Sequence, residues 1–362
     1  MVSGHGDDEW GHLVKEDAGR SLGRPWGGEL RGTFDQLVVE SEVLAGNPLG
    51  DPVRRPLFVY RAPETADDGS YPSVYVIQGM TGQVDMWLAR SAFEPTMLER
   101  VDDLFASGGC PPAMVVFVDA WTSYGGSQFI NSTSTGRYLD YLCDEVVPFV
   151  DDRYPTSASR DRRGLTGKSS GGYGAMVVPM LRPDVFGALA SHAGDALFEV
   201  CYQTEFPITA RVLRDSFEGS WDVFFERFRS APSLDFELYG HALNTYAMGA
   251  CYSPDPDNPG KALLPFDLET GRLDDELWSR WLEWDPVRMA PKRAEALGSM
   301  KRIYLDAGKS DEYFLDLGAQ AFAKELDRLE VDYTLDLFAG KHGGLQYRYP
   351  GAIKELVEAL AR

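Results

Sequence analysis

Two adjacent serines in a glycine-rich segment are the first residues whose type and spacing suggest chemistry. The segment RRGLTGKSSGGYGAM spans residues 162–176, and residues 167–171 fit the pattern G-x-S-x-G. This pattern is typical of a sharp strand-to-helix turn that strains its central residue and points its hydroxyl out of the sheet. Glycines are needed on both sides because a Cβ there would clash with the adjacent strand and helix. Ser169 is therefore the candidate nucleophile.

A serine hydroxyl is a poor nucleophile without a base, and the sequence has five histidines. His342 stands in FAGKHGG, directly after the last expected strand, where a base belongs in the chain order serine, acid, histidine. The alternative is an ordinary surface-loop histidine. His192 and His241 are interpreted as structural or cap histidines, and His5 and His12 lie in an N-terminal extension.

The acid that orients His342 should follow the preceding strand, in the segment LDAGKSDEYF. Asp311 is favoured because a carboxylate in this loop can reach back over the strand ends. Asp306 and Glu312 are the alternatives. Asp311 could instead cap a helix that begins at Tyr313, and we expect that role to exclude the catalytic one.

Charge that develops on a carbonyl oxygen requires two preorganised N–H donors. The amide of Ser170 follows the nucleophile and begins the next helix, whose positive dipole end points at the same place. The second donor is expected from QGMTGQ, where the candidate is the amide of Met80. An ordinary strand-to-helix turn is the alternative interpretation.

A further loop, WTSYGGSQFINSTSTG at 121–136, follows another expected strand and should line the mouth of the site. Its candidate substrate contacts are Trp121, Gln128, Phe129 and Asn131. An ordered polar loop is an equally good interpretation. Lys168, beside the nucleophile, either meets substrate charge or lies on the surface.

The segments that must position these residues alternate between strands and helices. Patterns of antiparallel strands occur at 34–44 and 56–63. Further strands are expected at 73–79, 113–120, 164–167, 187–194, 301–308 and 332–340, and helices at 87–106, 137–151, 170–182, 314–329 and 351–361. The alternation predicts an α/β fold with a mostly parallel central sheet of about eight strands and helices on both faces.

Residues 195–298 interrupt this alternation and are rich in aromatic side chains. We interpret them as a cap insertion beside the ligand crevice, at the carboxyl end of a strand. The aromatic residues form either a site for an aryl or bulky apolar group or the cap's own small core. Residues 1–33 are expected to be an N-terminal extension, with Trp10 and Trp26 as anchors, that precedes a domain at 34–362.

Composition limits the classes of partner. The chain has 362 residues and a formal net charge of -21, which disfavours nucleic acid and anionic membranes. There is no signal-peptide pattern, no membrane-length apolar run and no C-x-x-C pair, so a cytoplasmic location is expected, and pairing of Cys201 with Cys251 stays open. No metal-ligand spacing such as H-E-x-x-H occurs, and neither a metal nor a cofactor is expected.

The segments GKSSGGYGAM, YLDAGKSDEYF, GKHGG and LFVYRAP…YPSVYVIQGMTG resemble the putative-esterase (esterase D-type) branch of the α/β-hydrolases over about residues 34–361. Relatives in this branch include S-formylglutathione hydrolases, feruloyl esterases, enterochelin-type siderophore esterases and mycolyltransferases. The resemblance implies an α/β-hydrolase fold. It maps the family's nucleophile, acid and base onto Ser169, Asp311 and His342, and its oxyanion amides onto Met80 and Ser170. IQGMTG departs from the family, because many relatives have histidine before the glycine.

These residues predict a serine esterase that forms an acyl-enzyme from a small-molecule ester, which water then clears. An acyltransferase would use the same triad, exclude water and pass the acyl group to an alcohol. A non-catalytic ligand-binding protein with an α/β-hydrolase fold is the second alternative. Peptidase activity and formation of a homo-oligomer stay open.

Overall fold

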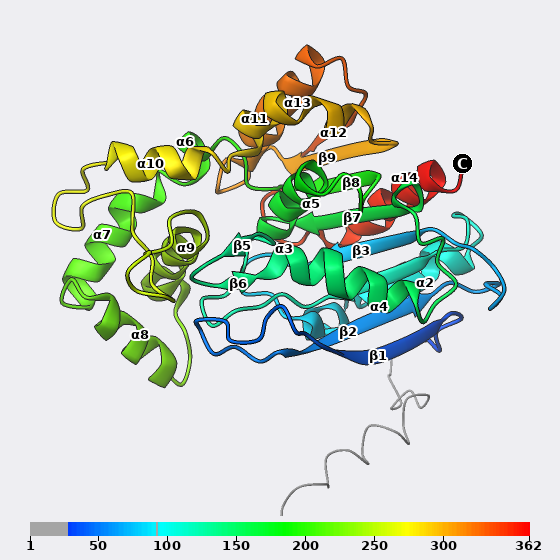
Figure 1. Ribbon diagram of the computed structural model, residues 1–362, viewed down its shortest axis with the longest axis horizontal. Helices are drawn as coiled ribbons and strands as arrows, with labels where there is room; N and C mark the ends of the chain where they lie inside the picture. Colours follow the sequence, from blue (N-terminus) through cyan, green and yellow to red (C-terminus); the bar gives the residue numbers. More distant parts are fainter. Residues whose placement is uncertain (1–27, 92) are drawn as a thin grey trace, which may run out of the picture.

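An eight-stranded sheet forms the centre of the computed structural model, which describes residues 28–91 and 93–362 (Figure 1). Its strands, in spatial order, are β1 (Thr33–Glu40), β2 (Arg54–Arg61), β4 (Met114–Val118), β3 (Ser73–Ile77), β7 (Arg163–Lys168), β8 (Ala188–His192), β9 (Arg302–Gly308) and β10 (Thr334–Phe338). Strand β2 is antiparallel to β1 and β4, and all later neighbours are parallel. The expected mostly parallel sheet of about eight strands is confirmed.

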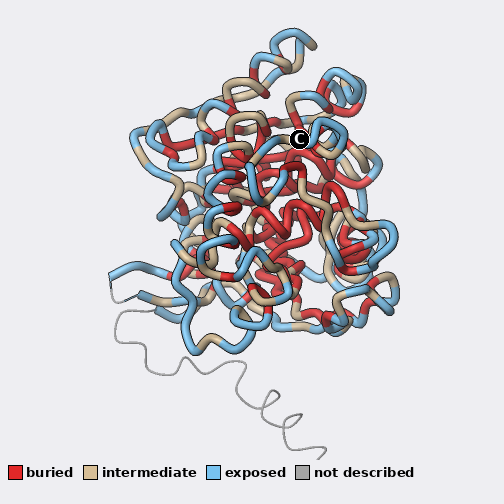
Figure 2. Tube along the Cα trace, turned by 90° about the vertical axis from the view of Figure 1, so that its left-hand side faces the viewer, coloured by how far each residue is buried: buried red, intermediate tan, exposed pale blue. Residues whose placement is uncertain are grey.

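Both faces of the sheet are covered, which explains why its central strands are continuous apolar runs. Val74 and Val76 of β3 pack toward α2 (Met97–Ala106) and α14 (Tyr349–Leu360). Tyr75 and Ile77 point the other way, toward α5 (Ser170–Leu181) and the helical segment made of α3 (Tyr138–Asp140), η2 (Tyr141–Val146) and α4 (Val147–Asp151). Figure 2 shows the buried residues gathered inside the molecule and the exposed ones around them.

The expected helix at 87–106 is wrong in its first half. The chain forms a short 3-10 helix, η1 (Val84–Leu88), and α2 begins only at Met97. Pro95 disfavours helical geometry in the residue before it, and Thr96 caps α2. The Thr96 Oγ1 accepts the Glu99 N–H at 3.1 Å, and the Glu99 carboxylate accepts the Thr96 N–H at 2.7 Å.

The segment between β8 and β9 is mainly helical, which the aromatic composition did not reveal. Its helices are α6 (Phe198–Cys201), α7 (Glu205–Ser216), α8 (Trp221–Ser230), α9 (Phe236–Tyr252), α10 (Asp275–Leu282), α11 (Pro286–Met289) and α12 (Ala294–Gly298). Figure 1 shows α7 to α10 grouped at one end of the sheet. We call the segment 195–298 the cap.

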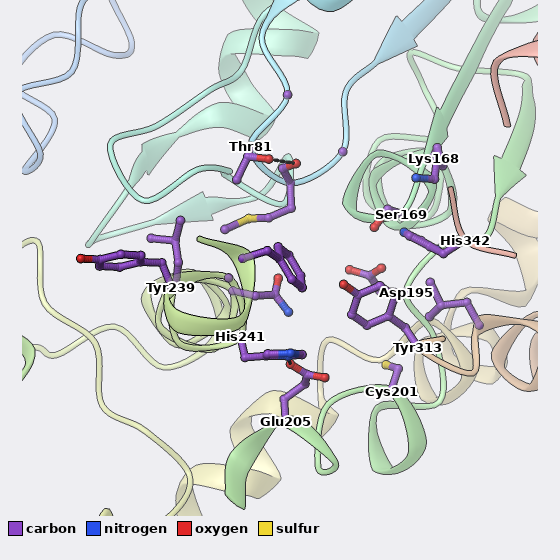
Figure 3. Close-up of a pocket in the computed structure, with 18 of the residues that line it drawn as sticks. Thr81, Lys168, Ser169, Asp195, Cys201, Glu205, Tyr239, His241, Tyr313 and His342 are labelled. Carbon is purple, nitrogen blue, oxygen red and sulfur yellow. Dashed lines mark hydrogen bonds and ion pairs between the residues drawn. The ribbon is translucent and has the colours of Figure 1, made fainter. Parts of the chain in front are cut away.

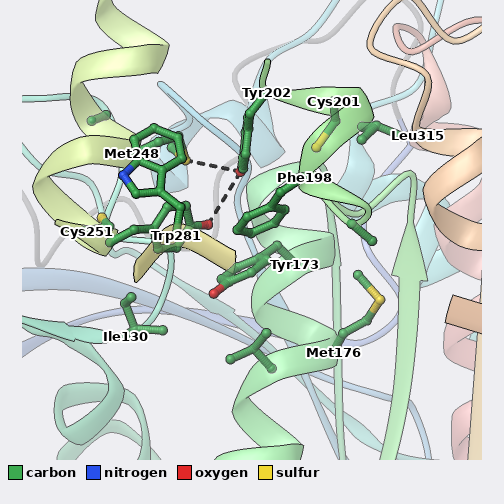
Figure 4. Close-up of a cluster of buried hydrophobic side chains, with 14 of the residues drawn as sticks. Ile130, Tyr173, Met176, Phe198, Cys201, Tyr202, Met248, Cys251, Trp281 and Leu315 are labelled. Carbon is green, nitrogen blue, oxygen red and sulfur yellow. Dashed lines mark hydrogen bonds between the residues drawn. The ribbon is translucent and has the colours of Figure 1, made fainter. Parts of the chain in front are cut away.

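Aromatic side chains join the cap to the body of the fold. Trp281 packs edge-on against Tyr202 at 5.7 Å, Tyr202 meets Phe198 at 4.6 Å, and Phe198 meets Tyr173 of α5 at 6.1 Å (Figure 4). Most of the cap aromatics therefore form a core that is continuous with α5. Cys201, which lies in this core, and Cys251 are free thiols rather than a disulfide.

The remaining helices also follow the expected pattern, with α13 (Leu315–Arg328) between β9 and β10 and α14 after β10. A two-stranded ribbon, β5 (Asn131–Ser132) and β6 (Gly136–Arg137), lies apart from the main sheet. The expected extension lies largely outside the described residues, since Trp10, Trp26, His5 and His12 all precede residue 28.

Candidate active site

Ser169 lies at the turn between β7 and α5 with φ 58° and ψ -126°. Residues other than glycine rarely adopt this backbone conformation, and they keep it only where the surrounding structure enforces it. A Cβ added at Gly167 would lie 2.5 Å from backbone atoms of Gly171, and one at Gly171 would lie 2.6 Å from the carbonyl oxygen of Ile77. The glycines therefore allow the close approach of strand and helix that holds Ser169 in this conformation.

His342 and Asp311 form a close pair at the same edge of the sheet. The Nδ1 of His342 lies 2.8 Å from Asp311 Oδ2, and the Asp311 side chain is completely buried. The other carboxylate oxygen accepts the Tyr313 N–H at 2.9 Å. One carboxylate thus holds both the imidazole and the local turn. Helix α13 begins at Leu315 without a side-chain cap, so Asp311 does not take the capping role that was expected to exclude the catalytic one.

Ser169 and His342 line one cavity, and Figure 3 shows the His342 ring directed toward the Ser169 hydroxyl. The structure records no hydrogen bond between these two side chains, which is common in a catalytic pair before substrate binds. The strained turn, the imidazole and its carboxylate come from three loops that all follow parallel strands. The arrangement can support attack by Ser169 on an electrophilic carbon with His342 as proton acceptor.

The two alternative acids have other partners. Glu312 accepts the His342 N–H at 3.0 Å and pairs with Lys341 at 3.1 Å, and these contacts, the first foremost, lower the pKa of Glu312 to about 2. Asp306 lies 2.8 Å from His192 Nδ1 and accepts from Arg348 at 3.0 Å. Glu312 therefore holds the loop of His342, and Asp306 is engaged with a fully buried histidine.

The two expected oxyanion donors, Met80 and Ser170, belong to segments that adjoin the nucleophile. A Cβ at Gly79 would be 2.9 Å from the Lys168 carbonyl oxygen and 3.4 Å from Ser169 Cβ, so this loop touches the turn. Ser170 is the first residue of α5, where amides have no intrahelical acceptor. Within residues 28–91 and 93–362, no group accepts a hydrogen bond from the Met80 N–H.

The cavity has a volume of about 460 Å³ and lies between the strand ends and the cap. Its apolar lining comes from both regions: Met80, Met86, Trp87, Phe228, Leu234, Phe236, Tyr239, Leu243, Tyr313, Leu315 and Tyr349. Its polar lining includes Lys168, Asp195, Glu205, His241 and Asn244. A concave, mainly apolar cavity with a few polar groups is typical of a small-molecule site.

The four expected substrate contacts do not line this cavity, and that expectation is corrected. Gln128 and Phe129 are buried under α5 and the cap, and the Gln128 amide donates to Tyr252 at 2.8 Å. The side-chain oxygen of Asn131 accepts the Asp140 N–H at 3.2 Å, and Trp121 lies near the buried Arg55. Most residues of the loop at 121–136 are buried in the core, although Asn131 is exposed, so the loop supports the site without lining the cavity.

The structure places further polar residues at the cavity beside the nucleophile. Lys168 lines the cavity instead of the surface, and burial lowers its pKa. Asp195 and Tyr313 also face the cavity (Figure 3). Asp195 follows β8 by three residues, so the rule that site residues follow parallel strands would have found it.

The sheet order, the strained serine turn and the histidine–aspartate pair define the α/β-hydrolase class. The chain belongs to the family described as "Putative esterase", whose model matches residues 53–344. The family description is that of an ester hydrolase.

The chain is similar to part of a bacterial protein in sequence and to several solved structures in fold. The uncharacterized protein YbbA of Bacillus subtilis is 28% identical over 176 residues, which are 45% of this chain and 63% of YbbA. A ferulic acid esterase structure shows 16% identity and a TM-score of 0.56, covering 92% of this chain and 98% of its own. An S-formylglutathione hydrolase from Agrobacterium tumefaciens shows 15% identity and a TM-score of 0.54, covering 93% and 97%. At these identities the two structures establish the fold.

No helix in the described part of the chain is long and apolar enough to cross a bilayer.

Proposed function

We propose that this protein hydrolyses a small-molecule carboxylic ester through Ser169, His342 and Asp311. The observation that carries the proposal is the convergence of a strained serine and a histidine on one cavity, with the histidine held 2.8 Å from a buried carboxylate. A structural role requires no such convergence of three loops.

In the proposed mechanism, Ser169 Oγ attacks the ester carbonyl while His342 Nε2 takes its proton. Asp311 keeps the Nδ1–H of His342 in place and stabilises the imidazolium that forms. The amides of Met80 and Ser170 donate to the oxyanion. His342 then protonates the leaving alcohol, and water attacks the acyl-enzyme with His342 again as base, which releases the acid and restores Ser169.

Hydrolysis of p-nitrophenyl acetate, butyrate and octanoate tests the proposal. We expect the wild type and Ser107→Ala, an exposed serine at the end of α2, to turn over at least one ester. Ser169→Ala should lose activity by about 10³-fold or more. Equal activity of Ser169→Ala and the wild type would contradict the proposal.

The same assay with added alcohol separates hydrolysis from acyl transfer. Water should remain the main acceptor, so free acid should account for most of the product. A new ester as the main product would instead identify an acyltransferase that uses the same residues.

A further inference from the structure

Asp195 places a carboxyl group in the cavity beside Ser169 and His342. The residue is 6% exposed, lines the cavity with Ser169 and His342, and makes no ion pair with a described residue. Figure 3 shows its carboxylate between Ser169 and Tyr313. The mechanism proposed above does not use this group.

One oxygen of Asp195 is held firmly. Oδ2 accepts from the Tyr202 hydroxyl at 2.8 Å, from the Gln128 amide at 3.3 Å and from the Ser170 hydroxyl at 3.4 Å. Because Ser170 adjoins the nucleophile, these contacts fix the carboxylate close to the place where the scissile ester must sit.

The other oxygen has no protein donor. No group in the described residues donates to Asp195 Oδ1, and this atom is not enclosed by protein. Asp285, a buried carboxylate outside the cavity, is satisfied on both sides, because its two oxygens accept from the amides of Leu197, Phe198 and Val287. Asp195 therefore differs from a purely structural aspartate.

When a substrate displaces water from the cavity, Asp195 Oδ1 has no donor unless the substrate supplies one, and an unpaired carboxyl oxygen is costly. Burial raises the pKa of Asp195 although three groups donate to it. A negative charge here would also oppose the charge that develops on the substrate oxygen. A hydrogen-bond donor on the substrate would offset both effects.

Resting on the proposed function, we infer that Asp195 Oδ1 accepts a hydrogen bond from a hydroxyl or ammonium group that the substrate carries near its scissile ester. Asp195 is then a specificity-determining residue, and the substrate class is a hydroxy- or amino-substituted ester rather than a plain alkyl ester. A site built to bind a donor discriminates strongly against the analogue that lacks it.

Matched esters test this inference: methyl butanoate, methyl 3-hydroxybutanoate and methyl 3-aminobutanoate for a donor on the acyl side, and 2-hydroxyethyl butanoate for the alcohol side. We expect kcat/KM of the wild type to favour at least one donor-bearing ester by about 10-fold or more. Asp195→Asn keeps an oxygen for the three donors and replaces the free oxygen with an NH₂ group, so the preference should disappear. Asp274→Asn, a cap residue that does not line the cavity, should retain it.

Binding to a variant without the nucleophile separates this inference from the proposed function. Calorimetry with Ser169→Ala and with Ser169→Ala/Asp195→Asn should show tighter binding of the donor-bearing ester only where Asp195 is present. Selective binding without hydrolysis by the wild type would support the inference and contradict the proposed mechanism. Equal binding and equal kcat/KM for plain and donor-bearing esters in the wild type would overturn the inference, whether or not the variants fold.

Discussion

At the scale of single residues, the contacts of Asp311 show what a substitution at this position would remove. Asp311 holds His342 with one oxygen and the Tyr313 amide with the other. The sequence predicted that these two residues lie in neighbouring loops, because the order serine, acid, histidine and the strand ends limit their positions, and the structure brings the two side chains together. It could not predict the substrate contacts, because the pattern of a polar loop does not show which side chains face the cavity.

Asp311→Asn should lower kcat by on the order of 10³- to 10⁴-fold, because the amide favours the wrong tautomer of His342. The variant should remain folded, since the amide oxygen can still accept the Tyr313 N–H. Steady-state kinetics and circular dichroism would check both statements, with the exposed Asp332→Asn as the matched control. Unchanged kcat in Asp311→Asn would assign the acid role elsewhere.

The lowered pKa of Glu312 predicts that the free energy of unfolding depends on pH. Its lowered pKa, about 2 against an ordinary 4.5, means that the folded state favours the charged form. The stabilisation is therefore complete above about pH 4.5 and is lost as the pH falls toward 2. The difference in free energy of unfolding between the wild type and Glu312→Gln, measured by urea denaturation, should shrink over this range. A difference that grows toward low pH would be inconsistent with the contact.

Gly171→Ala should destabilise the fold by about 3 kcal/mol or more, because the new Cβ would lie 2.6 Å from a backbone oxygen of β3. Gly298→Ala is the matched control, since no atom lies within 4 Å of its added Cβ. Denaturant midpoints of the two variants would give the comparison. A stable Gly171→Ala protein would show that strand and helix can separate without cost.

At the scale of elements, the periodic segments were predicted best. The strands of the sheet lie within a few residues of their expected positions, because buried parallel strands read as uninterrupted apolar runs. The first half of the helix expected at 87–106 failed, since apolar spacing continued past Pro95 although α2 starts only after it. The cap helices were missed although the helical period is present in the sequence: the buried residues Phe206, Thr209, Ala210 and Leu213 of α7 recur at helical spacing.

The capping box of α2, formed by Thr96 and Glu99, should contribute to stability without affecting the cavity. Thr96→Ala should cost about 1 kcal/mol of stability and leave kcat/KM unchanged, because it removes one cap without touching the site. Ser107→Ala, at the other end of the same helix, should cost less, because its hydroxyl bonds only to an exposed carbonyl. Thermal and chemical denaturation would measure both. A large loss of activity in Thr96→Ala would mean that α2 is coupled to the site.

At the scale of the whole molecule, the sheet provides the loops of the proposed triad and the cap provides much of the cavity wall. Ser169 and His342 follow strands, whereas Phe236, Tyr239 and His241 come from α9. A single sequence can assign the first group from topology, but the second depends on how an insertion folds back over the sheet. The substrate is therefore less predictable from the sequence than the chemistry.

The net charge of -21 also acts at this scale. A strongly acidic molecule should attract cationic esters over distances comparable to the screening length, which is about 10 Å at 0.1 M salt. We expect kcat/KM for a cationic ester to fall as ionic strength rises, while the value for a neutral ester of the same acyl group stays constant. Parallel salt titrations would check this, and a rise for the cationic ester would contradict it.

The most direct test of the central claim is covalent labelling with a serine-directed fluorophosphonate, followed by peptide mass spectrometry that distinguishes Ser169 from Ser170. We predict a single adduct on Ser169, formed much more slowly in His342→Gln than in the wild type. Labelling of Ser170, or of no serine in a folded and active protein, would contradict the assignment of Ser169 as the nucleophile.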